Sequence, residues 1–169
     1  MNNNEVILRA IEPEDLDLLY KIENDQRLWG VGTTNVPYSR YVLHDYIANT
    51  SGDIYSDQQV RLIIENGVGD TVGIVDIINF DAKNCRAEVG IVIACEYRQQ
   101  GFAKQALAKI TEYALQVLHL HQLYAIIDSD NETSLKLFEK AGFSYNCQLN
   151  DWLYDGRKYH HAQLMQFFL

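Results

Sequence analysis

A strand–helix–strand pattern over residues 87–127 constrains the fold more than any other feature of the sequence. The apolar segments 87–94 and 123–127 are typical of buried strands. Between them a helix is expected over residues 101–119, because apolar side chains recur there at the three-and-four spacing of one buried face: Ala103, Ala106, Leu107, Ile110, Ala114, Val117 and Leu118. Two strands joined in this way pair in parallel through a right-handed crossover.

The remaining segments predict antiparallel strands and further helices. Two hairpins are expected, residues 60–65 with 72–78 and residues 150–154 with 157–168, the second closed by the two-residue turn Asp155-Gly156. A short strand at 6–9 precedes helices that open at 12–15, cover 38–49, and cover 132–141 up to Gly142. The fold class is therefore α/β (α+β), with a mixed, mostly antiparallel sheet, one parallel crossover and helices on both faces. Residues 29–35, rich in glycine and small polar residues, are expected to form a mobile loop at a substrate mouth.

Length and charge limit the classes of protein. The 169 residues suit a single domain, residues 1–169, and the net charge of −9 argues against nucleic-acid and anionic-membrane binding. A cationic partner is favoured instead. The cysteines (Cys85, Cys95 and Cys147) lack the spacing of a disulfide framework or a metal site, so no metal is predicted. Neither a signal peptide nor an apolar run of ~18–20 residues is visible, which predicts a cytoplasmic protein.

An anion-binding loop is predicted at residues 97–104, between the buried strand and the long helix. Unpaired N–H groups and a partial positive charge at a helix amino terminus suit a phosphate, and Gly101 lets an anion approach the backbone closely. Residues 97–111 contain Arg98, Lys104, Lys109 and no acid, hence a charge of +3, which leaves −12 for the rest of a chain whose total is −9. On spacing alone, an ordinary strand-to-helix turn with solvated basic residues explains this pattern about as well.

Three blocks resemble the GNAT superfamily of acetyl-coenzyme A-dependent N-acetyltransferases. Arg98-Gln99-Gln100-Gly101-Phe102-Ala103 resembles its pyrophosphate signature [Q/R]-x-x-G-x-[G/A]. Residues 86–93 resemble the strand that holds the pantetheine arm, and residues 131–143 resemble the N-x-x-[S/A]-x-x-x-[Y/F]-E-K-x-G-F helix. The blocks occur in the family's order and spacing. The resemblance is closest to the spermidine/diamine acetyltransferases, with the ribosomal-protein alanine acetyltransferases next.

The resemblance implies acetyl-coenzyme A as cosubstrate and direct attack of an amine on the acetyl carbonyl. Backbone N–H groups of residues 98–103 would hold the pyrophosphate, residues 91–93 would pair with pantetheine, and an N–H near Ile93 would stabilise the oxyanion. Glu88 would take the amine's proton through water; its alternative interpretation is an exposed strand acid or a partner of Arg86. The implied coenzyme-binding residues are Ile91, Val92, Ile93, Arg98, Gln99, Gln100, Gly101, Phe102, Ala103, Lys104, Asn131, Ser134 and Phe138.

Two departures from the family concern proton transfer and the acceptor. Many members carry a tyrosine at the position of Phe138, which protonates the departing thiolate; phenylalanine cannot, so water, Tyr124 or Tyr145 is expected to substitute in a slow or water-dependent enzyme. In the polyamine branch the loop and second helix carry several acids, whereas residues 33–40 here carry none and include Arg40. The acids expected around the mouth are Asp25, Asp45, Asp53 and Asp57.

The sequence therefore predicts an N-acetyltransferase acting on a primary amine, either a polyamine or another small amine. A ribosomal-protein or peptide N-terminal acetyltransferase, and a catalytically weak acyl-coenzyme A-binding module, remain as alternatives. Residues 128–132 are interpreted as a helix cap, and His160 and His161 point to opposite faces of a strand and so cannot share a metal. A homo-oligomer is left open.

Overall fold

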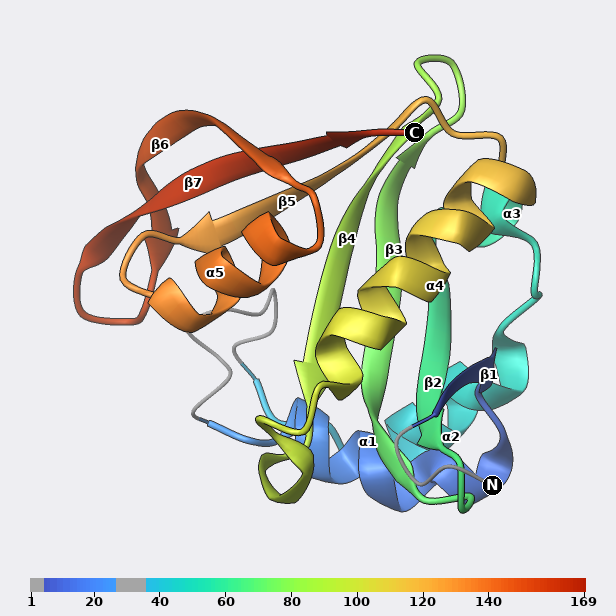
Figure 1. Ribbon diagram of the computed structural model, residues 1–169. Coiled ribbons are helices and arrows are strands. Elements are labelled where there is room, and N and C mark those ends of the chain that lie inside the picture. Colours follow the sequence, from blue (N-terminus) through green and yellow to red (C-terminus); the bar gives the residue numbers. More distant parts are fainter. Residues whose placement is uncertain (1–4, 27–35) are drawn as a thin grey trace.

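The computed structural model describes residues 5–26 and 36–169, and over these ranges it forms a seven-stranded sheet in the order β1-β2-β3-β4-β5-β7-β6 (Figure 1). The strands are β1 (Val6–Ala10), β2 (Val60–Asn66), β3 (Thr71–Asp81), β4 (Arg86–Ile93), β5 (Gln122–Asp128), β6 (Ser144–Tyr154) and β7 (Tyr159–Phe168). The helices are α1 (Leu16–Glu23), α2 (Arg40–Asn49), α3 (Ile54–Asp57), α4 (Phe102–Gln116) and α5 (Glu132–Lys140), with 3-10 turns η1 (Pro13–Asp15) and η2 (Cys95–Tyr97). Of the helices in the described residues, none has the length and apolar character to span a membrane.

The predicted parallel crossover between β4 and β5 is confirmed, and the place where these strands separate is an opening in the sheet. Strands β4 and β5 are parallel, whereas the other neighbouring strands pair antiparallel. The parallel pairing is short: it joins Arg86 to Gln122, Ala87 to Leu123 and Glu88 to Tyr124. Beyond Glu88 the two strands diverge and the sheet opens into a V (Figure 1).

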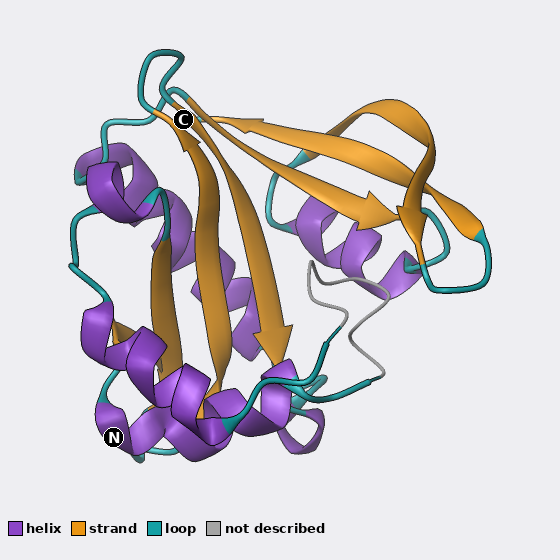
Figure 2. Cartoon of the chain, turned by 180° about the vertical axis from the view of Figure 1, so that it is seen from behind, coloured by secondary structure: helices purple, strands orange, loops and turns teal. Residues whose placement is uncertain are grey.

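Helices cover both faces of the sheet, as the sequence predicts. Helix α4 packs Leu107 and Ile110 against the face that carries Val75 and Ile77, and Figures 1 and 2, from opposite sides, show it in front of β2–β4 and then behind them. Helix α1 packs Ile22 on the opposite face, against Ile63 and Ile74. Neighbouring residues along a strand face opposite ways, so the consecutive apolar residues of β2 and β3 serve both layers.

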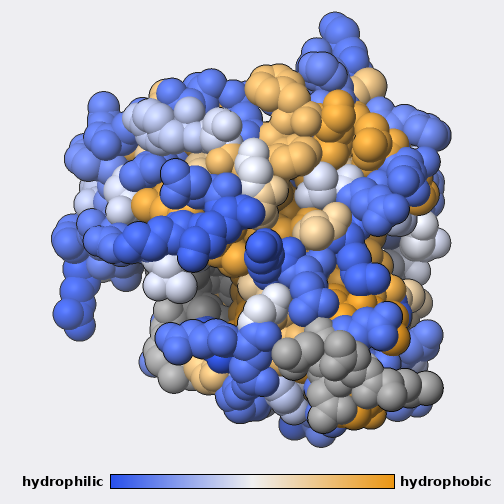
Figure 3. Space-filling model, in the orientation of Figure 1, coloured by the Kyte–Doolittle hydropathy of each residue, from blue (hydrophilic) through white to orange (hydrophobic). Residues whose placement is uncertain are grey.

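Helix α4 is shorter than predicted. It ends at Gln116, and Val117, expected on the buried face, is 58% exposed. The chain reverses at His119, whose φ of 52° is left-handed, and Leu120 is buried instead. The predicted face is confirmed at Ala106, Leu107, Ile110 and Ala114, which are all fully buried, whereas Ala103 and Leu118 are partly buried. Figure 3 shows apolar side chains gathered between the end of α4 and the carboxyl terminus, while hydrophilic ones cover much of the surface over α5, β6 and β7.

The carboxyl-terminal hairpin also differs from the prediction. Its strands end at Tyr154 and resume at Tyr159, so the connection has four residues rather than two. The Asp155 carboxylate accepts hydrogen bonds from the N–H groups of Arg157 (2.7 Å) and Lys158 (2.9 Å), which stabilises the wider loop. Strand β6 begins at Ser144 instead of residue 150, because this edge strand is largely exposed and its polar residues hide the apolar alternation. Helix α3 was not predicted, and the expected loop at 29–35 lies outside the described residues.

Candidate active site

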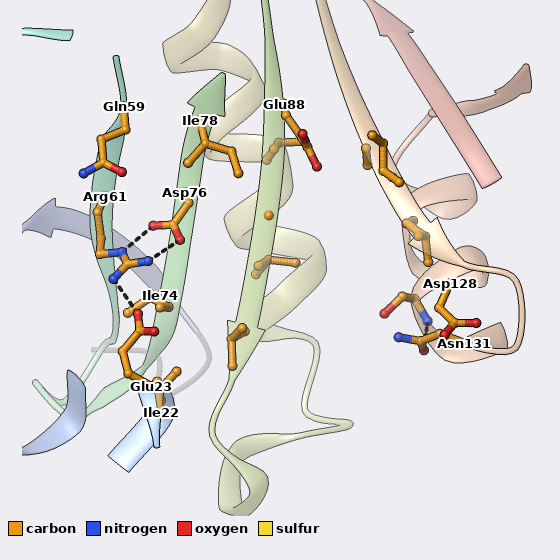
Figure 4. A pocket seen from close by; sticks show the side chains of 18 of the residues that line it. Ile22, Glu23, Gln59, Arg61, Ile74, Asp76, Ile78, Glu88, Asp128 and Asn131 are labelled. Atoms are coloured by element: carbon orange, nitrogen blue, oxygen red, sulfur yellow. Dashed lines mark hydrogen bonds and ion pairs between the residues drawn. The ribbon is translucent and has the colours of Figure 1, made fainter. Parts of the chain in front are cut away.

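A cavity of about 480 Å³ lies where β4 and β5 diverge, on the face of the sheet that α1 covers. Its lining residues come from α1, α2, β2, β3, β4, β5, α5 and β6, and Figure 4 labels several of them. Of the predicted site residues, the structure places six in this cavity: Glu88, Ile91, Val92, Asn131, Ser134 and Phe138. Ile93 and the loop residues 98–104 are not among the lining residues; they follow directly, at the end of β4 and the start of α4.

Glu88 is the last β4 residue in the parallel pairing with β5, so its side chain stands at the apex of the opening. Burial raises the pKa of its carboxyl, and a hydrogen bond from Asn79 Nδ2 to Oε2 (2.8 Å) acts in the opposite direction. Arg86 forms its ion pair with Asp81 (3.2 Å), so the interpretation of Glu88 as the partner of Arg86 is not supported. A carboxylate whose pKa is raised in this way is suited to accept a proton.

The backbone beyond Glu88 is open on the β5 side. The Ala94 N–H donates to Val72 O (2.9 Å), so the peptide groups of Ala94 face β3. Along an antiparallel strand, the N–H and C=O of successive residues point alternately toward and away from a given neighbouring strand. The peptide groups of Ile91 and Ile93 therefore face away from β3, toward the side from which β5 has departed. The Ile93 carbonyl accepts a hydrogen bond from Arg98 Nε (3.0 Å). This strand edge is able to pair with an extended ligand.

The loop before α4 has the backbone geometry of an anion site. Gly101 is the N-cap residue of α4, has a φ of 87° and has open space where a Cβ would lie; the helix start has no side-chain cap. Gln99 also has a positive φ, 61°. The side chain of Phe102 is buried in the core, and that of Gln100 donates to Glu96 O (3.0 Å), so neither of them caps the helix start. The Arg98 N–H donates to Cys95 O (3.4 Å), which leaves the N–H groups closer to the start of α4 as the candidates for binding an anion.

The α5 segment places Phe138 in the cavity. Asn131 Oδ1 accepts from Ser134 N–H (3.1 Å), which confirms the predicted helix cap. Phe138 is 4% exposed, and its ring packs edge-on against Phe143, 5.0 Å away. Of the expected substitute hydroxyls, Tyr145 is 58% exposed on the edge strand β6. Tyr124 does not line the cavity, but it pairs with Glu88 in the β4–β5 register, and burial together with the charge of Glu88 raises its pKa. The described tyrosines that do line the cavity are Tyr38 and Tyr46.

A half-buried charge cluster that the sequence did not predict forms one wall (Figure 4). Arg61 donates from Nε and Nη2 to the two carboxylate oxygens of Asp76 (2.8 and 2.9 Å), and from Nη1 to Glu23 Oε1 (2.6 Å). Burial opposes the guanidinium charge, but Asp76 and Glu23 outweigh it and raise the pKa of Arg61. Its signal in the sequence is a charge inside an apolar strand: Asp76 interrupts residues 72–78, and Arg61 interrupts residues 60–64.

Asp128, at the end of β5, places a further carboxylate on the opposite wall of the cavity from Asp76 and Glu23 (Figure 4). Its Oδ2 lies 3.5 Å from Nδ1 of His160, whose Nε2 contacts Asp155 Oδ2 at 2.9 Å. The hydrogen bond with Asp155 and the charge of Asp128 raise the pKa of His160. Asp128 therefore contributes negative charge to the cavity beside a ring that favours protonation.

The acids expected at the mouth do not line the cavity. Asp53 accepts from Tyr55 N–H (3.1 Å) and caps α3, Asp57 accepts from Ser51 Oγ (2.8 Å), and Asp45 accepts from Asn49 Nδ2 (2.9 Å). Asp25 is likewise absent from the lining residues. Arg40 pairs with Asp17 and stacks over the ring of Tyr20 (4.6 Å). The described lining residues instead place four carboxylates (Glu23, Asp76, Glu88 and Asp128) around one guanidinium (Arg61), a net formal charge of −3.

Residues 5–144 match the family model described as the acetyltransferase (GNAT) domain. The chain therefore belongs to the GNAT acetyltransferase family, and the expected fold class is confirmed.

Two curated relatives cover most of the chain. It is 29% identical to the spermidine N(1)-acetyltransferase of Escherichia coli K12, over 96% of this chain and 86% of that protein. It is 30% identical to the putative ribosomal N-acetyltransferase YdaF of Bacillus subtilis, over 94% of this chain and 88% of that protein. A solved structure of spermidine N-acetyltransferase from Vibrio cholerae, in complex with CoA and spermine, superimposes with a TM-score of 0.85 at 24% identity, covering 98% and 96% of the two chains.

Proposed function

We propose that this protein is an acetyl-coenzyme A-dependent N-acetyltransferase whose acceptor is a cationic primary amine, with a polyamine such as spermidine as the first choice. The observation that carries this proposal is the cavity itself. It combines a half-buried carboxylate, Glu88, with a net formal charge of −3 at the point where β4 is no longer paired with β5.

The residues fit an acyl-coenzyme A. The left-handed Gly101 and the uncapped start of α4 suit a pyrophosphate, and the backbone of Ile91 and Ile93 suits the amide-bearing pantetheine arm. Acetyl-coenzyme A supplies an acetyl thioester. The pantetheine arm, held along β4, would lead that thioester toward the opening beside Glu88.

The acceptor must lose a proton before it attacks. An alkylamine resembles lysine, with a pKa near ~10.4, so at neutral pH it enters as ammonium. Glu88 takes that proton through a water molecule, and the neutral nitrogen attacks the acetyl carbonyl. The N–H of Ile93 stabilises the oxyanion. The C–N bond forms and the C–S bond breaks, and the nitrogen loses a second proton as the amide forms. A water molecule passes that proton to the departing thiolate, because Phe138 has no hydroxyl to donate.

The charge of the cavity favours a polyamine over a neutral or anionic acceptor. Glu23 and Asp76 on one wall and Asp128 on the other are placed to attract the further ammonium groups of a polyamine while one amine lies near Glu88 (Figure 4). The relatives named for spermidine are consistent with this choice.

Two other functions each have one supporting observation. The similarity to a putative ribosomal N-acetyltransferase favours a peptide amino terminus as acceptor. Phe138 favours an acyl-coenzyme A-binding module with little catalysis, since the usual proton donor is absent.

The deciding test is the release of free thiol from acetyl-coenzyme A in the presence of an acceptor panel. Spermidine, spermine, short diamines, amino acids and alanine-headed peptides are compared, together with calorimetric titration of acetyl-coenzyme A. We expect saturable turnover with polyamines. Turnover only with the peptides supports the ribosomal alternative, binding without turnover supports the module, and no heat of binding at millimolar coenzyme rejects all three.

Location and assembly extend the same proposal. We propose that the protein acts in the cytoplasm, where acetyl-coenzyme A and polyamines are both present. We further propose that it forms a homo-oligomer, on the analogy of the Vibrio cholerae relative whose dodecameric structure has a TM-score of 0.82 and 24% identity.

A further inference from the structure

The strand that faces Glu88 contains a bulge. In the β3–β4 register Ile78 pairs with Glu88, and the next pair is Asp81 with Arg86. Two residues of β3, Asn79 and Phe80, therefore lie opposite a single residue of β4. An extra residue of this kind bends a strand and redirects a side chain, and bulges are enriched beside active sites.

Asn79 occupies the unusual backbone position within this bulge. Its φ is 51°, in the left-handed region that non-glycine residues seldom adopt and that asparagine tolerates best. In this position Nδ2 of Asn79 lies 2.8 Å from Oε2 of Glu88 and donates a hydrogen bond to it. Phe80, the other residue of the bulge, is buried in the core and anchors the segment.

We propose that Asn79 is a positioning residue for Glu88: the bulge holds the asparagine amide against the carboxylate, which fixes the carboxylate at the apex of the cavity in its proton-accepting form. This inference rests on the proposed function, in which Glu88 is the base. Asn79 is exposed whereas Glu88 is half-buried, so the carboxylate spans the boundary between the cavity and solvent. A proton that Glu88 takes from the acceptor can therefore pass directly to solvent.

The surroundings of Glu88 contain few groups able to replace this contact. Among the described residues, the ionisable groups that line the cavity or lie on the strands beside Glu88 include Asp76 and Asp81 on β3, Arg86 on β4, Tyr124 and Asp128 on β5, Arg61 on β2, Glu23 on α1, Tyr46 on α2 and Tyr38 before it. Both arginines are paired with other carboxylates, Arg86 with Asp81 and Arg61 with Asp76. Burial raises the pKa of Glu88, and the hydrogen bond from Asn79 lowers it. Without the amide, the carboxylate would keep the cost of burial and lose the compensating contact.

Three variants separate the amide from the backbone. N79G removes the amide and keeps the freedom to adopt a positive φ; N79D places a second carboxylate beside Glu88. N84A is the matched control, because Asn84 lies in the same hairpin and donates Nδ2 to Asp81 (2.7 Å) instead of to Glu88. Two readouts are used: the acid limb of the pH profile of kcat/KM for spermidine, and the ¹³C titration of the Glu88 carboxyl, assigned with E88Q.

The direction of the expected shift in the pH profile follows from the proposed role of Glu88 as the base. Activity rises with pH as Glu88 ionises, so raising its pKa moves the acid limb to higher pH. We expect an upward shift of about 0.5–1 pH unit for N79G and a larger one for N79D in both readouts, with N84A unchanged. An unmoved titration in N79G and N79D, or an equal shift in N84A, overturns the inference. If no amine is acetylated, the proposed function fails, and the titration still decides whether Asn79 controls the ionisation of Glu88.

Discussion

At the scale of single residues, the carboxylates that line the cavity differ in the groups to which they are paired. Asp76 and Glu23 share the guanidinium of Arg61, and Asp128 lies beside the ring of His160. Glu88 forms no ion pair with any residue in 5–26 or 36–169, and its hydrogen bond comes from a neutral amide. A nearby cation would favour the ionised carboxylate; with none paired to it among the described residues, burial raises the pKa of Glu88.

Replacing Glu88 tests its role as the base. E88Q keeps the size of the side chain but cannot accept a proton, so we expect kcat for spermidine to fall by roughly 10²–10⁴-fold, with the affinity for acetyl-coenzyme A little changed. Steady-state kinetics and calorimetry measure the two quantities. E96Q is the control, because Glu96 pairs with Lys21 (2.6 Å) outside the cavity. A kcat for E88Q within a few-fold of the parent would exclude Glu88 as the base.

Phe138 offers the opposite experiment, a gain of function. F138Y adds a hydroxyl to a ring that already lines the cavity, so we expect a higher kcat because the departing thiolate acquires a proton donor. F138L, which changes the ring without adding a hydroxyl, should show no gain. Turnover and coenzyme affinity are compared for both variants. Unchanged turnover in F138Y, at unchanged coenzyme affinity, would show that thiolate protonation does not limit the reaction.

At the scale of elements, the ends of helices depend on glycines in left-handed conformations. Gly101 begins α4 and Gly142 follows α5, with φ values of 87° and 98°. The surroundings of the two glycines differ. A Cβ at Gly101 would meet open space, whereas at Gly142 it would lie 2.6 Å from Cε2 of Phe167. The first glycine is therefore required for its backbone conformation, and the second for both conformation and packing.

A pair of alanine substitutions separates strain from packing. Both G142A and G156A force an alanine to a positive φ, but nothing lies within 4 Å of a Cβ at Gly156. We expect G156A to lower the free energy of unfolding by about 1 kcal/mol, and G142A to lower it by a further ~1–3 kcal/mol, because the Phe167 ring must shift. Chemical denaturation measures both values. Equal losses would mean that the ring yields freely and that packing at the end of α5 does not depend on the glycine.

At the scale of the whole molecule, charge is distributed unevenly. The chain carries −9 in total and the described cavity walls carry −3, while residues 97–111 carry +3. Residues of β4 line the negative cavity, and the basic loop follows the end of the same strand without lining the cavity. An anionic coenzyme and a cationic acceptor are therefore attracted to different places, which separates the two substrates before they meet.

This distribution predicts a salt effect that depends on acceptor charge. Added salt screens the field, so KM should rise more steeply with ionic strength for spermidine than for a monoamine. Initial rates at saturating acetyl-coenzyme A, at several concentrations of sodium chloride, give the two slopes. Parallel slopes would show that the second and third charges of the acceptor do not interact with Glu23, Asp76 or Asp128.

The sequence predicts functional residues that lie in continuous motifs and misses those that do not. Gly101, Asn131 and Phe138 lie in short continuous motifs, and the structure places each at a helix start or on the cavity wall. Glu23, Arg61 and Asp76 have no motif; Arg61 lies 38 residues from Glu23 and 15 from Asp76, and the three meet because α1, β2 and β3 pack together. The bulge at Asn79 was equally invisible: a one-residue shift would break an alternation of apolar and polar residues, but β3 is apolar at consecutive positions and has no alternation to break.

The sequence by itself determined the parallel crossover, the loop before α4 and the cap of α5, because apolar periodicity, glycine and capping residues act over a few neighbouring positions. Only the tertiary structure decided which carboxylates face the acceptor, where β4 and β5 separate and which side chain supports Glu88. Those contacts join residues distant in the chain, and the free energy that brings them together comes from the packing of the whole sheet rather than from any one segment.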